Sequence, residues 1–172
     1  MRAVVACFGN VLRADDGVGP QVAEQLARQV LPPGVVVLEV GIGGIHLVQE
    51  LLAAPADLLL VVDAVDLQRP AGSVIVQRPH VLDVSALPVH ERRDQLADMH
   101  LATPEKALMV CRGLGVLPAS TFVVGVQTTD TQESRYGLSD TTAAAVPVAV
   151  EQVLRLLAEH AVDGTATRPV GG

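Results

Sequence analysis

The chain has 172 residues, of which 49% are hydrophobic and 2% aromatic, and its formal net charge is −7. This length suits one domain with a core of its own, and no shift in composition indicates a second domain. The negative charge argues against a polyanionic partner such as a nucleic acid, because phosphate binding needs a clustered basic surface.

The chain opens with the pattern of a strand, a glycine-bearing loop and a helix. Residues Ala3–Phe8 form an apolar run typical of a buried strand, and Val18–Val30 carries apolar residues at helical spacing. Between them lies the loop Gly9–Gly17, which contains the adjacent carboxylates Asp15 and Asp16. Ligands of parallel sheets bind at the carboxyl ends of the strands, so this loop is a candidate functional site. A structural alternative stays open, in which one aspartate caps the helix that follows.

Two further junctions between a strand and a loop follow. A strand is expected at Val35–Val40, a glycine-rich loop at Gly41–Gly44 and a helix at Ile45–Leu52. The loop matches neither the dinucleotide fingerprint nor a Walker sequence, which disfavours a nucleotide site. The most apolar strand, Leu58–Val62, ends at Asp63. A carboxylate there is costly unless it is solvated, paired or bound, and no helix follows for it to cap, so Asp63 is a candidate functional residue.

The second half continues the alternation of strands and helices. A polar segment at residues 78–99 is longer than a typical connection, which favours a functional or mobile loop, and it leads to His100. Thr103 and Pro104 are typical of a helix start. The remaining predicted elements are a strand at Ser73–Gln77, a helix that ends near Arg112, a strand at Thr121–Gln127 and a helix at Thr141–His160.

These elements predict an α/β fold. We expect a single three-layer domain over residues 1–161, with a twisted, mostly parallel sheet covered by helices on both faces. Residues 162–172 are expected to form a disordered tail. Cys7 and Cys111 lie in apolar runs and match no metal or redox spacing, so both are expected in the core. With no apolar run of about twenty residues and no signal peptide pattern, we expect no membrane partner and a cytoplasmic location.

Asp16, Asp63 and His100 each lie at a defined junction and together make a set of two carboxylates and one imidazole. Such a set leaves open positions on a divalent metal ion, and imidazole suits nickel or zinc. An alternative use is acid–base chemistry, with one carboxylate as the base.

The run from Gly9 to Gly19 reads Gly-Asn-x-Leu-x-x-Asp-Asp-Gly-x-Gly and resembles the N-terminal signature of the hydrogenase maturation proteases. The resemblance continues through Val62-Asp63-Ala64, His100 and Gly137-Leu138-Ser139, and it covers nearly the whole chain. It implies an endopeptidase that removes a C-terminal extension from the large-subunit precursor of a nickel–iron hydrogenase, after nickel has been inserted.

The resemblance also implies roles for particular residues. Asp16, Asp63 and His100 would contact the metal and carry the catalysis. With that role given to Asp16, we interpret Asp15 as the structural aspartate of the first loop. No cofactor would be permanently bound, because the nickel is carried by the substrate, although zinc or cadmium can take its place in a crystal. The family commonly has an Asp-Gly-Gly-Thr-like turn where this chain reads Glu39-Val40-Gly41-Ile42.

The substrate-binding residues implied by that turn are Glu39, Gly41 and Gly43. A rival prediction is a Rossmann-like module that binds a nucleotide or another anion and has no peptidase activity.

Overall fold

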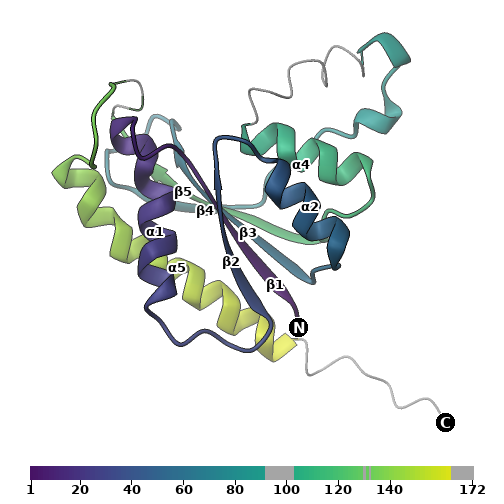
Figure 1. Ribbon diagram of the computed structural model, residues 1–172, viewed down its shortest axis with the longest axis horizontal. Coiled ribbons are helices and arrows are strands. Elements are labelled where there is room, and N and C mark those ends of the chain that lie inside the picture. Colours follow the sequence, from purple (N-terminus) through teal and green to yellow (C-terminus); the bar gives the residue numbers. More distant parts are fainter. Residues whose placement is uncertain (92–102, 130, 132, 164–172) are drawn as a thin grey trace.

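The computed structural model of the protein describes residues 1–91, 103–129, 131 and 133–163. A five-stranded sheet forms its centre, with helices on both faces (Figure 1). The strands are β1 (Ala3–Phe8), β2 (Val35–Gly41), β3 (Leu58–Val65), β4 (Val74–Gln77) and β5 (Ser120–Gln127). The helices are α1 (Val18–Ala27), α2 (Ile45–Ala53), α4 (Pro104–Gly113) and α5 (Asp140–Asp163), with short 3-10 turns at Ala14–Gly17 and Val84–Ala86.

The strand order is β2-β1-β3-β5-β4. Strands β2, β1, β3 and β5 run parallel to one another, and β4 pairs with β5 as an antiparallel edge strand. Because β1 and β3 lie inside the sheet, all of β1 and the first five residues of β3 are buried. A sheet covered on both faces needs such continuous apolar strands. The predicted α/β fold with a mostly parallel sheet is confirmed.

The two faces of the sheet carry separate cores. Val5 and Cys7 of β1 pack with residues of α1 and α5, whereas Val4, Ala6 and Phe8 pack with residues of α2 and α4. This alternation follows from the two-residue period of a strand. Figure 1 shows the same arrangement, with α1 and α5 on one side of the sheet and α2 and α4 on the other.

Two helices differ in length from the prediction. Helix α1 ends at Ala27 rather than Val30, and the Val30 side chain is fully exposed, so it adds no apolar contact that would extend the helix. Helix α5 is longer than predicted and continues through Pro147. Among the described residues, α5 has the length and mean hydropathy (1.3) of a membrane span, yet 44% of that stretch is buried. It packs on α1 and β5 as a core helix.

Both cysteines lie in the core, as predicted. Burial, with a smaller contribution from Glu39, raises the pKa of the Cys7 thiol to about 12. Burial also raises the pKa of Cys111 to about 11. Thiols this far from ionisation are poor nucleophiles. Residues 162 and 163, which were predicted to begin a disordered tail, belong to α5. Residues 164–172 of the predicted tail, residues 92–99 of the long polar segment and His100 lie outside the described residues.

Candidate functional site

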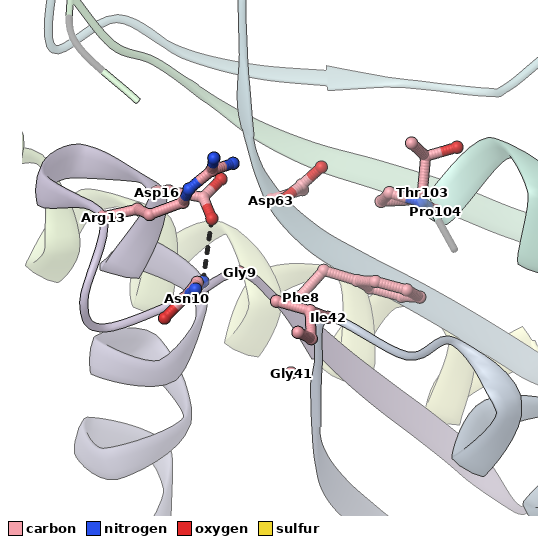
Figure 2. Close-up of a pocket in the computed structure, with 10 residues that line it drawn as sticks. All are labelled: Phe8, Gly9, Asn10, Arg13, Asp16, Gly41, Ile42, Asp63, Thr103 and Pro104. Atoms are coloured by element: carbon pink, nitrogen blue, oxygen red, sulfur yellow. Dashed lines mark hydrogen bonds between the residues drawn. The ribbon is translucent and has the colours of Figure 1, made fainter. Parts of the chain in front are cut away.

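The carboxyl ends of β1, β2 and β3 meet at one edge of the sheet and border a cleft of about 340 Å³ (Figure 2). The start of α4 forms its far wall. This is the edge at which parallel α/β sheets bind ligands. The lining residues are Phe8, Gly9, Asn10, Arg13, Asp16, Gly41, Ile42, Asp63, Thr103 and Pro104.

The first loop folds back on itself because residue 9 is glycine. Gly9 has a φ of +126°, and a Cβ there would lie 1.9 Å from the backbone oxygen of Asp16. The Gly9 amide donates a hydrogen bond to the carbonyl oxygen of Gly41 at 3.2 Å, which ties the loop to β2. Only a residue without a side chain fits this close approach. The loop therefore brings Asp16 over the end of β1.

Asp16 points into the cleft and is held by its own loop. Its Oδ2 accepts a hydrogen bond from the backbone amide of Asn10 at 2.9 Å (Figure 2). Burial raises the pKa of Asp16, and the Asn10 hydrogen bond and the positive charge of Arg13 partly oppose that rise. Asn10 also shapes the turn, because its side chain accepts from the amide of Leu12 at 2.9 Å.

Asp63 lies within β3, beside Gly125 of β5, rather than just after the strand as predicted. The alternation along β3 places it on the α2 and α4 face of the sheet, together with Leu59 and Val61. Burial, followed by the negative charge of Asp16, raises its pKa to about 7, and a hydrogen bond from the Ala64 amide opposes the rise. Asp16 and Asp63 thus form an electrostatically coupled pair of carboxylates facing one cleft.

Asp15 has a different surrounding. Its side chain is fully buried, and its Oδ1 accepts from the Ser139 amide at 2.7 Å while its Oδ2 accepts from the Ser139 hydroxyl at 3.0 Å. Asp15 therefore anchors the first loop to the start of α5, which confirms its predicted structural role. The alternative that an aspartate caps α1 is wrong, because Gly17 is the N-cap and no side chain bonds there.

The structure brings together three of the six predicted site residues, namely Asp16, Asp63 and Gly41. Glu39 is exposed and pairs in register with Cys7, on the α1 and α5 face rather than in the cleft. Gly43 lines a smaller hollow between α2 and α4. His100 lies outside the described residues, so its place in the site stays a prediction.

Several cleft residues were not predicted as site residues, among them Phe8, Arg13 and Thr103. Arg13 could have been found, since it lies three positions before Asp16 in the same loop. Thr103 was predicted as a helix cap, and its Oγ1 does accept from the Lys106 amide at 3.4 Å. Within the described ranges, no group of three or more metal-binding side chains is present. In the described part of the cleft, the carboxylates of Asp16 and Asp63 are the side chains that could bind a metal ion.

The comparisons with known proteins identify the family. A family model described as "Hydrogenase maturation protease" matches residues 20–156. The chain belongs to the hydrogenase maturation protease family. The Hydrogenase 2 maturation protease of Escherichia coli is 31% identical over 168 residues, which cover 95% of this chain and 94% of that protein.

Solved structures agree with this membership of the hydrogenase maturation proteases. The hydrogenase maturating endopeptidase HybD from Escherichia coli has a TM-score of 0.72 and 27% identity, covering 93% of this chain and 94% of its own. A hydrogenase 2 maturation peptidase from a Thaumarchaeota archaeon has a TM-score of 0.64 and 30% identity, covering 91% of this chain and 98% of its own. The protein is thus a hydrogenase maturation endopeptidase, and the rival of a binding module without peptidase activity is rejected.

Proposed function

We propose that this endopeptidase removes the C-terminal extension of a nickel–iron hydrogenase large-subunit precursor after nickel insertion. It recognises the nickel carried by the substrate through Asp16, Asp63 and His100. The observation that carries this proposal is the coupled carboxylate pair in the cleft, Asp16 and Asp63. The family membership supports the precursor as the substrate.

The carboxylate pair suits a divalent cation. Asp63 is partly buried next to a second negative charge, and a cation between the two carboxylates would relieve both the burial cost and the repulsion. Two carboxylates and one imidazole leave coordination positions open for the substrate. His100 precedes the cleft residue Thr103 by three positions, and three residues span at most about 11 Å. This supports His100 as the third ligand.

Two hydrolytic routes fit the pair. In the first, both carboxylates are ionised and hold the substrate's nickel, and the metal polarises the scissile carbonyl or a water molecule. In the second, Asp16 accepts a proton from water, the water oxygen attacks the carbonyl carbon, and protonated Asp63 donates its proton to the leaving nitrogen, as in an aspartic-type peptidase. A carboxylate that binds a metal ion has lost its proton, so Asp63 cannot take both roles at once.

The pH dependence of cleavage separates the two routes. If Asp63 binds nickel, protons compete with the metal, and the cleavage rate rises as the pH passes through about 7. If Asp63 is the proton donor, the rate falls over the same range. We expect the rise, because recognition through nickel needs both carboxylates ionised.

The end of β2 contributes to the wall of the cleft. Gly41, with a φ of +65°, borders the cleft, and we place it in the wall that faces the substrate. No resident cofactor is required. A cytoplasmic location is supported by Cys7 and Cys111, which are both free thiols, as in a reducing compartment.

The experiment is incubation with a nickel-loaded precursor, followed by mass spectrometry of the released peptide. We expect cleavage by the wild type and none by Asp16→Ala, Asp63→Ala or His100→Ala in folded protein. Asp66→Ala is a matched control, because Asp66 is an exposed carboxylate three residues beyond Asp63 and outside the cleft. Cleavage by His100→Ala would refute the ligand assignment. Equal cleavage of nickel-free precursor would refute recognition through the metal.

A further inference from the structure

A second hollow, of about 330 Å³, lies on the other side of the first loop from the cleft. Val11 and Ala14 of the loop and Gln21 of α1 line it on one side, and Tyr136, Leu138 and Ala143 line it on the other. We call it the Tyr136 groove. Asn10, Arg13 and Asp16 of the same loop line the cleft. One short loop therefore separates the two hollows.

The walls of the Tyr136 groove are fixed to each other. The Ala14 amide donates to the Arg135 carbonyl oxygen at 2.7 Å, and the buried Asp15 carboxylate accepts two hydrogen bonds from Ser139. Figure 1 shows the segment that leads into α5 beside the loop that precedes α1. A groove held in this way needs little ordering when a ligand enters, which favours binding.

An exposed aromatic side chain borders this groove. The protein has only three aromatic residues of the Phe, Tyr and Trp types, and Tyr136 is 76% exposed. Leu12, in the same loop as Val11, is 63% exposed. Tyrosine is enriched among the residues that dominate binding interfaces, and neighbouring apolar side chains help to exclude water around it.

We propose that the Tyr136 groove binds the C-terminal extension of the precursor and so determines which extension is accepted. This proposal rests on the proposed function. The nickel stays with the body of the substrate, which therefore occupies the cleft. The chain beyond the scissile bond must leave the cleft, and across the first loop it meets a mostly apolar groove that suits an apolar side chain of the extension.

The test uses two groove variants with matched controls. Tyr136→Ala removes the exposed ring, and Ala143→Leu fills the groove from an exposed position on α5. The controls are Leu114→Ala, an exposed apolar residue outside the groove, and Ala144→Leu, the next exposed position on α5, which does not line the groove.

Two measurements are made, one of them independent of catalysis. Binding of a labelled synthetic peptide with the sequence of the extension is followed by fluorescence anisotropy, and cleavage of the nickel-loaded precursor is followed by mass spectrometry. We expect each groove variant to raise the peptide Kd and the precursor KM about tenfold with kcat unchanged, and each control to match the wild type.

The outcomes distinguish this proposal from the proposed function. If the peptide does not bind, or binds equally to the groove variants and the wild type, the groove proposal is overturned even when the precursor is cleaved. If the peptide binds through the groove but no precursor is cleaved, the proposed function fails while the groove assignment stands. A wild-type dimer that Ala143→Leu dissociates, with peptide binding unchanged, would show that a second copy of the chain occupies the groove and would also overturn it.

Discussion

The burial of Asp63 predicts that the enzyme is less stable at neutral pH than a variant without that charge. Burial and the charge of Asp16 raise the pKa of Asp63 from 3.8 to about 7 in the folded protein. Asp63→Asn keeps the size of the side chain and removes the ionisable group. We therefore expect this substitution, which should abolish cleavage, to stabilise the fold.

The sign and the magnitude follow from proton linkage. Between about pH 4 and pH 7 the folded protein holds a proton on Asp63 that the unfolded chain releases, so the free energy of unfolding decreases as the pH rises. The pKa difference is 7 − 3.8, or about 3. At about 1.4 kcal/mol for each tenfold change in proton affinity, the ionised carboxylate costs at most about 4 kcal/mol above pH 7.

Urea unfolding at about pH 4.5 and at about pH 8 measures this effect. We expect Asp63→Asn to match the wild type at the lower pH, within about 1 kcal/mol, and to exceed it by about 2 to 4 kcal/mol at the higher pH. Glu151→Gln, which removes one exposed carboxylate from α5, is the control and should change neither value. A variant no more stable than the wild type at pH 8 would refute the reasoning.

Three further predictions concern the same region. Gly9→Ala should destabilise the fold by more than about 2 kcal/mol and abolish cleavage, because the new methyl group would overlap the Asp16 backbone oxygen; thermal unfolding and the precursor assay check this. Ser139→Ala removes the hydroxyl bonded to buried Asp15 and should cost about 1 to 3 kcal/mol in urea unfolding, whereas an unchanged value would argue against the anchor. Zinc at 100 times its Kd should add about 2.7 kcal/mol to the wild type and much less to Asp63→Asn, measured by calorimetry.

The sequence predicts those parts of the site that local pattern determines. Continuous apolar runs locate β1 and β3, and the carboxylates that follow them are conspicuous because burying a charge is costly: Asp16 lies in the loop after β1, and Asp63 ends the apolar run of β3. Parallel strands then bring both carboxylates to the same edge. The proximity of Asp16 to Asp63 follows from this topology together with the turn at Gly9, which brings Asp16 back over the end of β1.

Other features depend on contacts between distant segments. Nothing near Asp15 identifies its partner Ser139, which is 124 residues away. Thr103 reaches the cleft because α4 packs beside α2, a consequence of tertiary packing rather than of the cap motif. The position of Glu39, by contrast, could have been predicted from the sequence. The alternation along β2 buries Val40 under α2 and turns Glu39 to the opposite face. Counting that alternation would have placed Glu39 outside the cleft wall.

The cost of ionising Asp63 beside Asp16 suggests how cleavage could be timed to follow nickel insertion. An enzyme that cuts too early would process a precursor still without nickel. In the free protein, burial and the charge of Asp16 raise the pKa of Asp63 to about 7, so the protonated form is well populated near neutral pH. A substrate without a cation offers nothing to offset that charge, whereas a bound divalent ion displaces the proton and favours both carboxylates. Under the proposed function, the partly buried pair that destabilises the free enzyme would make productive binding depend on nickel insertion, which is the discrimination that this function requires.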